Sequence, residues 1–467
     1  MFDQTVKDDD TFSAGGDIEL VNEKALNWFD VSAIGTGEML FTAGWAWIVF
    51  IASMYGIMWT LIGFAGGALI ICLTWWLYRE MITAVPEPGS IQSYGREAGL
   101  FSLGTTYFVL YAPVYGAFMW LELTVAKGLL HELFPSVSDW IWPFVVLLPV
   151  MAINLLGHQI TGKIQAALVV CTLIGDVLLA VFIWWLLADQ SAWAANFESP
   201  TPITWLTPFA VGGLWLAIMA GILEVQQVLV DEWSDFERSR DIGLLSAAWQ
   251  LWVRQVPLAL GILATMPLAA LTTMSVPTVE VVEAKLGHGF VFYLAMASML
   301  IATYTTLSVF FMAESKVLAL YSQQGALPRI IGRYSSRAVP WVAILLLAAF
   351  ALVGTFITHF DFMIAVLSEW SATLYIVIAV FYLGMKRRKD LERPVTSKFG
   401  VPIAIFIIIA TSLSAYSGFV TNWQAAATWF LVVAIFIAYD QLVVPRTKRG
   451  SFYREQVLRK RTSAARL

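Results

Sequence analysis

Long apolar stretches dominate this chain, and short polar or charged stretches separate them. We predict that twelve of them cross a membrane as helices, because a spanning helix takes about 20 apolar residues. The predicted spans are residues 29–53, 58–80, 102–126, 141–156, 165–187, 205–229, 252–272, 290–312, 340–358, 362–384, 400–418 and 424–443. The eighth span continues as a polar helix through Tyr321. The pattern predicts an all-α membrane protein with a single domain over residues 29–443.

The composition excludes an ordinary soluble domain. Hydrophobic residues make up 59% of the chain and charged residues 13%, against about 45–50% and about 25% in soluble domains. A single soluble core of this size cannot hide such a surplus of apolar side chains. Membrane lipid is therefore an expected partner, and nucleic acid is not.

The charges along the chain predict its orientation. If both termini face the cytoplasm, Lys127 and Lys285 are the only residues among the 28 Lys and Arg that lie on external connections. Such a skew is what the positive-inside rule predicts. Residues 1–28 then form an acidic cytoplasmic tail without the features of a signal peptide, and residues 444–467 form a basic cytoplasmic tail. We expect a multi-pass protein of the inner membrane.

The first span contains Gly35 and Gly37, followed directly by Glu38. A carboxylate deep in a bilayer costs several kcal/mol, and irregular backbone there is tolerated only where it is buried in protein or lines a cavity. One interpretation is a helix that breaks at these glycines, with free N–H and C=O groups that bind a solute or ion. The other is close helix packing through small residues.

The sixth span has a similar stretch, in which Gly212, Gly213 and Gly221 precede Glu224. The two predicted breaks are five helices apart. This spacing is expected if spans 1–5 and 6–10 are inverted repeats, with a binding site at their interface.

Three segments resemble the amino acid–polyamine–organocation permease family. Residues 314–321 (ESKVLALY), 325–328 (GALP) and 337–340 (RAVP) resemble its "SRxLYAMxRDGxLP" segment and the proline that opens the ninth span. Glu224, Asp231-Glu232 and Arg238 resemble its "GFE…EE.KNPxR" run, although the Phe and the Asn-Pro are missing. Residues 154–157 (NLLG) and 162–165 (GKIQ) resemble its "N..G…(A/G)KIQ" linker.

This resemblance implies alternating access around a central site in a leucine-transporter-type fold. That fold has a five-plus-five inverted repeat, with repeat one at about 29–187 and repeat two at about 205–384, and two extra helices at about 400–443. Helices 1 and 6 would be broken. The family's "IGxGIF" motif reads IGTGEM at residues 34–39. The acid directly after the glycine is similar to the ethanolamine-permease-like branch.

The expected solute is a small amine or amino acid. An ionised Glu38 would attract an amine and repel a carboxylate; a protonated Glu38 would instead carry a coupling proton, and the sequence leaves both open. The predicted substrate-binding residues are Ser32, Ile34, Gly35, Thr36, Gly37, Glu38, Tyr111, Trp215, Ala220, Gly221 and Glu224. Around an ammonium group, an aromatic box could form from Tyr107, Tyr111, Trp215 and Trp370.

Other carboxyl groups inside predicted spans are Glu122, Asp176, Glu314 and Glu369. We expect Glu314 to pair with a basic loop near the cytoplasmic end. Glu122 and Glu369 remain open between helix packing and a role in the transport path.

The coupling ion is also left open. Some relatives carry a Lys on the fifth span where this chain has Thr172. Hydroxyl groups of Thr303, Thr305, Thr306 and Ser308 on the eighth span, with backbone carbonyls near Ser32 and Ala33, could bind sodium. A carboxylate-borne proton is the alternative.

The motifs expected of other function classes are missing. The sequence has no nucleophile elbow, phosphate-binding glycine loop or metal-ligand spacing, and its four histidines are scattered. We therefore predict no enzyme activity, no cofactor and no metal site. The predicted function is a secondary active transporter, monomeric or homodimeric; the alternative is an exchanger, or a transporter-like sensor of the same solutes.

Overall fold

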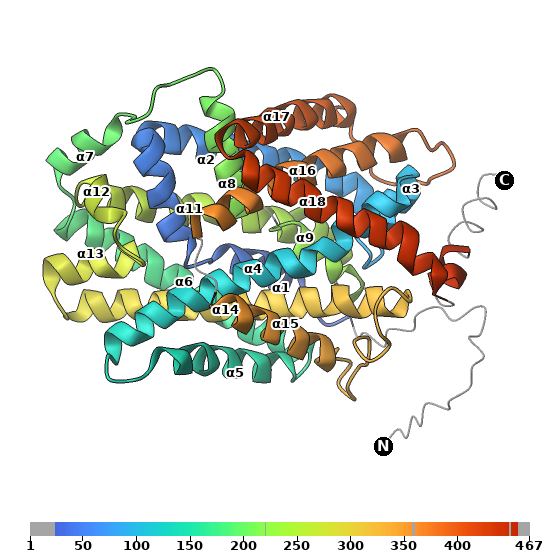
Figure 1. The fold of residues 1–467 in the computed structure, drawn as a ribbon, viewed down its shortest axis with the longest axis horizontal. Coiled ribbons are helices and arrows are strands. Elements are labelled where there is room, and N and C mark those ends of the chain that lie inside the picture. The colour runs from blue at the N-terminus through green and yellow to red at the C-terminus, as the bar shows by residue number, and fades with distance from the viewer. Residues whose placement is uncertain (1–23, 220, 357–359, 448–449, 456–467) are drawn as a thin grey trace.

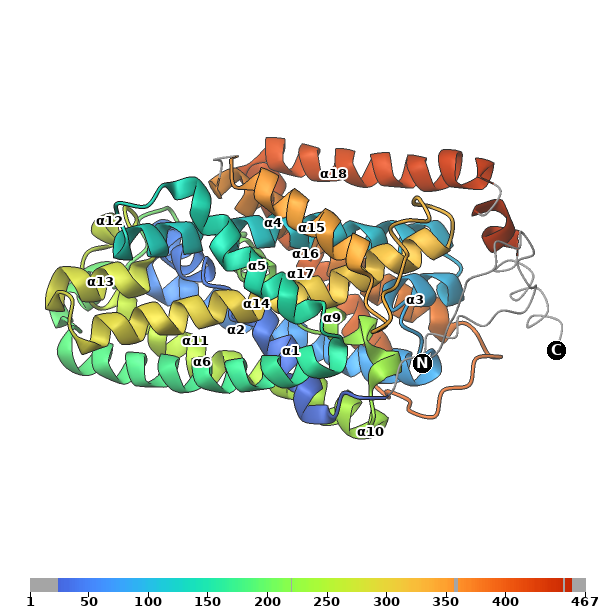
Figure 2. The same ribbon diagram turned by 90° about the horizontal axis from the view of Figure 1, so that it is seen from below.

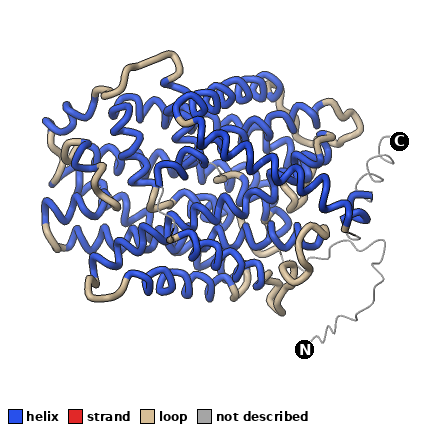
Figure 3. The backbone as a smooth tube through the Cα atoms, in the orientation of Figure 1, coloured by secondary structure: helices blue, strands red, loops and turns tan. Residues whose placement is uncertain are grey.

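The computed structural model describes residues 24–219, 221–356, 360–447 and 450–455 (Figure 1). Helices form most of this part of the chain, and loops connect them (Figure 3). Within the described residues, strand-type pairing is limited to an isolated bridge between Leu26 and Trp233. The prediction of an all-α protein is confirmed.

The helices are α1 (Trp28–Met39), α2 (Gly44–Ala84), α3 (Ile91–Ala98), α4 (Phe101–Leu133), α5 (Trp142–Asn154), α6 (His158–Leu186), α7 (Gln190–Phe197), α8 (Thr207–Met219), α9 (Glu224–Val228), α10 (Phe236–Arg238), α11 (Leu244–Leu263), α12 (Leu268–Leu271), α13 (Pro277–Leu286), α14 (Phe290–Gln323), α15 (Trp341–Gly354), α16 (Phe360–Lys386), α17 (Gly400–Thr421) and α18 (Trp423–Ala438). Short 3-10 and π-helical turns extend several of them.

Many of these helices suit a membrane. In the described part of the chain, eight segments are long and apolar enough to cross one, counting Thr207–Val228 as a single segment. Two shorter apolar helices, Asp139–Asn154 and Trp341–Gly354, lie between them in the chain. Helices α17 and α18 carry many exposed apolar side chains, as expected for a surface that lipid covers.

The first two predicted spans have a different arrangement from the predicted one. Helix α1 continues through both glycines to Met39, and the chain turns at residues 40–43 before α2. The predicted break at Gly35 and Gly37 is therefore wrong in position. The predicted gap between spans 1 and 2, residues 54–57, is correct, because Gly56 leaves the helical conformation there with φ of 73°.

Two later helices begin earlier than predicted. Helix α11 begins at Leu244 rather than 252, and α6 at His158 rather than 165. The first turns of α6 (HQITGKIQ) are polar, so hydropathy alone does not detect them, whereas those of α11 (LLSAAWQ) are mostly apolar and the predicted boundary was simply too late. The early turns of both helices pack on α1: Ser246 donates a hydrogen bond to Ser32 (2.6 Å), and Lys163 pairs with Asp30 (2.6 Å).

Helices α1, α4 and α14 form the centre of the bundle, and α18 lies along its outer edge (Figure 2). Nearly every residue in the middle of α4 and α14 is buried. Helices α12 and α13 lie at one end of the bundle, and α3 and α10 at the other (Figure 2).

A network of charges joins helices at the end that carries α10. Lys316 of α14 donates to Asp231 (2.6 Å) and Glu232 (2.8 Å), and His158 lies 2.8 Å from Glu232. Glu232 lies beyond the apolar segment Thr207–Val228. Burial alone would raise the pKa of Glu232, but the charges of His158 and Lys316 outweigh burial and hold the pKa well below its usual range.

Replacing Glu232 with glutamine is expected to lower the free energy of unfolding by about 1.5–3 kcal/mol at neutral pH, because a hydrogen bond between charged groups is lost. A carboxyl group whose folded pKa is depressed stabilises the fold above its unfolded pKa. The difference in the free energy of unfolding between wild type and Glu232→Gln should thus be constant above about pH 5 and shrink as the pH falls below about 4. Thermal unfolding in detergent measures it. The exposed Glu237 on the same connection provides the control, Glu237→Gln; equal effects of the two variants would contradict the prediction.

Candidate functional site

Charged side chains from other helices hold both ends of the break in the first span. At the end of α1, Arg254 Nη1 of α11 donates to the carbonyl of Met39 (3.1 Å). At the start of α2, Glu122 Oε1 of α4 accepts from the N–H of Ala43 (3.0 Å), and its other oxygen accepts from Thr303 (2.9 Å). Free groups at helix ends need such partners. These contacts stabilise the helix end at residue 39.

The arginine that binds the end of α1 is part of a buried ion pair. Arg254 and Asp176 of α6 are bonded to each other and are 3% and 0% exposed. Ser298 of α14 donates to the same carboxylate (2.5 Å), and the Arg254 guanidinium lies 5.3 Å from the ring centre of Trp45. The pair therefore links α1, α2, α6, α11 and α14 at the break.

Gly35 and Gly37 allow close packing instead of a break. A Cβ on Gly35 would lie 2.1 Å from Nε2 of Gln226, and one on Gly37 would lie 1.8 Å from Nε2 of Gln165. Gln226 uses this space to donate to the carbonyl of Val31 (2.7 Å). The interpretation as small residues at a helix contact is the one that the geometry supports.

The sixth span breaks where expected. Helix α8 ends at Met219 and α9 begins at Glu224; the predicted residue Ala220 lies outside the described residues. Gly221 has φ of 109°, and a Cβ there would lie 1.8 Å from Tyr115 Oη and 2.6 Å from Glu38 Oε1. Glycine is thus needed both for the backbone conformation and for the approach of Glu38 from α1.

Six buried side chains that lie close enough to interact electrostatically form what we call the central polar cluster: Glu38, Tyr111, Tyr115, Glu224, Glu314 and Tyr375. Tyr78 donates a hydrogen bond to Glu224 Oε1 (2.9 Å). The other oxygen of Glu224, Oε2 of Glu38 and both carboxyl oxygens of Glu314 have no hydrogen-bond partner among the described residues, and neither do the three phenol oxygens.

Buried polar groups in proteins are normally hydrogen-bonded, and buried charges are normally paired. No Lys or Arg in the described part of the chain forms an ion pair with the three carboxyl groups of the cluster. The cluster is therefore chemically suited to bind a cation, a proton or a donor-rich solute.

The predicted aromatic box is not assembled. Two of its predicted members, Tyr111 and Trp370, lie beside Tyr115, which the sequence analysis did not single out. The ring centre of Tyr115 lies 5.9 Å from that of Tyr111 and 5.6 Å from that of Trp370. The other two predicted members lie elsewhere. Trp215 packs on Phe64 of α2 (4.8 Å), and Tyr107 lies beside Trp429 of α18 (6.3 Å).

The remaining predicted residues do not converge on one site. Ile34 belongs to the apolar core, and the hydroxyls of Thr36, Thr172 and Thr305 bond to carbonyls of their own helices. Ser32 faces α11, and Ala33 belongs to a small apolar cluster that includes Ala302. Thr306 does reach α1, donating to the carbonyl of Gly37 (2.8 Å). The predicted sodium site, which also needs backbone carbonyls near Ser32 and Ala33, is not tested by these side-chain contacts and stays a prediction.

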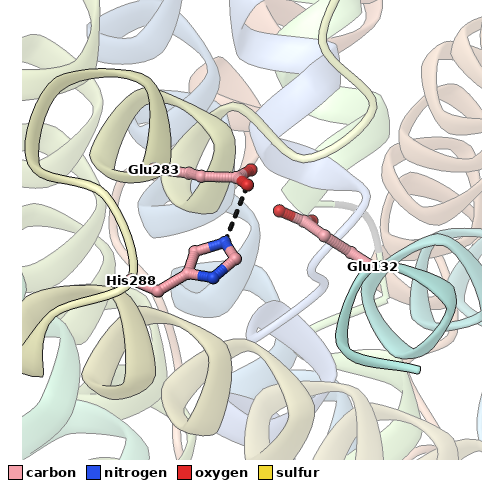
Figure 4. Close-up of side chains that lie close together, drawn as sticks. All are labelled: Glu132, Glu283 and His288. Carbon is pink, nitrogen blue, oxygen red and sulfur yellow. Dashed lines mark hydrogen bonds and ion pairs between the residues drawn. The ribbon is translucent and has the colours of Figure 1, made fainter. Parts of the chain in front are cut away.

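A second polar cluster lies between α4 and the α13–α14 connection (Figure 4). Its members are Glu132, Glu283 and His288, whose nearest ligand atoms lie within 4.8 Å of one another. His288 Nε2 lies 2.8 Å from Glu283 Oε1. A hydrogen bond from Glu132, and to a lesser extent one from His288, holds the pKa of Glu283 below its usual range. These residue types could hold a metal ion, a grouping that the scattered histidines in the sequence did not suggest.

Comparison with known proteins supports a transporter fold. The family model described as amino acid permease matches residues 31–444. The L-asparagine permease of Streptomyces coelicolor is 24% identical over 72% of this chain and 72% of its own length. The aromatic amino acid transport protein of Escherichia coli K12 is 24% identical over 79% of this chain and 81% of its own length. The gamma-aminobutyric acid permease of the same strain is 23% identical over 69% of this chain and 72% of its own length.

Two solved structures share the fold. One is a Na+-coupled sialic acid symporter in a substrate-bound outward-open state, with a TM-score of 0.57, 13% identity, and coverage of 84% of this chain and 90% of that chain. The other is a nucleobase-cation-symport-1 family transporter in a closed conformation with bromovinylhydantoin bound, with a TM-score of 0.55, 14% identity, and coverage of 93% and 97%.

Proposed function

Because this chain belongs to the amino acid permease family, we propose that it is a secondary active transporter of a small amine-bearing solute. It is a multi-pass membrane protein and not an enzyme. The solute is an amino acid, an amine or an amino alcohol, and it crosses the inner membrane by alternating access. Relatives that are named for amino acid transport support this class of solute.

The central polar cluster is the observation that carries this proposal. Glu38 from the first span and Glu224 from the sixth both lie in it, and both have a carboxyl oxygen that no described residue binds. An ammonium group has three donors and no acceptor, so it matches such oxygens. The cluster is enclosed by protein, as in a state closed to both sides of the membrane.

We further propose that twelve segments span the membrane as a five-plus-five inverted repeat with two added helices, and that both tails are cytoplasmic. The lysines and arginines on the even-numbered connections support this orientation. For coupling, we propose a proton carried by the cluster, because Glu38, Glu224 and Glu314 each have a carboxyl oxygen without a hydrogen-bond partner among the described residues; sodium is the alternative.

Two measurements test the proposal. A thermal-shift screen of amines, amino alcohols and amino acids should find solutes that stabilise the purified protein, by about 2.7 kcal/mol at a concentration of 100 Kd. A labelled hit should then accumulate in vesicles that contain the protein when a proton gradient is imposed. Uptake that requires a counter-solute would indicate an exchanger, and a solute that binds but never crosses would indicate a sensor.

A further inference from the structure

Glu314 has a different environment from the one expected for it. It does not pair with a basic loop: its side chain is fully buried, and neither carboxyl oxygen has a hydrogen-bond partner among the described residues. The lysine two positions later, Lys316, binds Asp231 and Glu232 instead. Residues two apart on a helix do not share a face, so Glu314 and Lys316 serve different surroundings.

Helix geometry places Glu314 at the central polar cluster. Phe310 lies one turn earlier on α14 and hence on the same face, and its ring lies 4.9 Å from that of Tyr115, centre to centre. The charge of Glu314 also acts on Glu38, Tyr111 and Tyr115. Three helices therefore each contribute one carboxyl group: α1 with Glu38, α9 with Glu224 and α14 with Glu314.

The break of the first span leaves little to bind the carboxylate of a solute. Free N–H groups at a helix start are suited to that role, but at the break of the first span Glu122 already accepts from Ala43 (3.0 Å). The guanidinium at the same break, that of Arg254, pairs with Asp176. A zwitterion would thus bring its own carboxylate to three others without a cationic partner among the described residues.

We infer that Glu314 is a third solute-binding carboxyl group and that it makes the transporter select amines without a carboxylate over zwitterionic amino acids. This inference rests on the proposed function and narrows it to one charge class. In the interior of a protein, unit charges a few ångströms apart interact strongly enough to change affinity at least tenfold.

Matched solute pairs test the inference. Glycine and ethanolamine, alanine and alaninol, and phenylalanine and phenylalaninol differ mainly in whether a carboxylate or an alcohol follows the amine. Wild type should bind the amino alcohol of a pair at least tenfold more tightly. Glu314→Gln should reduce this preference at least tenfold, which corresponds to 1.4 kcal/mol, and Glu314→Asp should retain most of it.

Glu369→Gln is the matched control. Glu369 is also buried in the bundle, but it faces α17, because a Cβ on Gly418 would lie 2.1 Å from its Oε1. Its replacement should leave the preference unchanged. A wild type that prefers the amino acid overturns the inference without any variant, as does a folded Glu314→Gln protein with unchanged preference. Either result leaves amine transport standing, whereas failure to transport any amine or amino acid would overturn the proposed function itself.

Discussion

Replacing Glu38 with glutamine is expected to abolish transport or to shift its pH dependence. Glu38 Oε1 lies at the break of the sixth span, beside Gly221 and Tyr115, and its Oε2 has no hydrogen-bond partner among the described residues. If the carboxylate binds the amine, the variant loses a charge-assisted hydrogen bond of about 1.5–3 kcal/mol, which is roughly a tenfold to hundredfold loss of affinity. If it carries the coupling proton, the amide cannot do so.

Uptake of a labelled solute from pH 5 to 8 distinguishes these two roles. A role in solute binding predicts a raised KM at every pH, whereas a role in coupling predicts uptake that no longer responds to a proton gradient. Glu369→Gln again serves as the control, because that carboxyl group faces α17. Unchanged uptake together with an unchanged pH profile in Glu38→Gln would remove Glu38 from the mechanism.

The sequence predicted the long helices well, since lipid forces a spanning segment to satisfy its backbone within a helix. Hydropathy is a local property, so it located even the kink at Gly56 between the first two spans. It failed where a helix begins with polar turns, as α6 does. There, contacts with α1 stabilise residues that no apolar pattern indicates.

The position of the first break could not be predicted, because it depends on residues far apart in the chain. Glu122 and Arg254 bind the two ends of the break from α4 and α11. The glycines that suggested a break instead leave space that the side chains of Gln226 and Gln165 fill. Only the folded arrangement shows which of these partners reaches the backbone.

The site itself was predictable in part. Glu38 and Glu224 stood out because a charge in an apolar span is costly, and the structure places both in the central polar cluster. Tyr115 and Tyr375 did not stand out, because aromatic residues are common throughout this chain. Tyr115 does lie one turn after the predicted Tyr111, a helical spacing that would have identified it.

Arg254 was the other residue that the sequence analysis missed, and its replacement should have the largest effect on stability. Arg254→Met is expected to lower the free energy of unfolding by about 3–5 kcal/mol, because it leaves Asp176 buried without its partner. It also removes the hydrogen bond to the Met39 carbonyl at the end of α1, so transport should fall as well.

The double variant Arg254→Met, Asp176→Asn should recover part of this loss, because it removes the uncompensated charge together with its partner. Thermal unfolding of the purified variants measures both effects. The exposed pair of His131 and Asp139 supplies the control: Asp139→Asn should change stability by less than about 1 kcal/mol, as is usual for surface pairs. If the single and double variants were equally unstable, the loss would arise from the hydrogen bond at the helix break rather than from an unpaired carboxylate. If Arg254→Met were as stable as wild type, the ion pair would not hold the break in place at all.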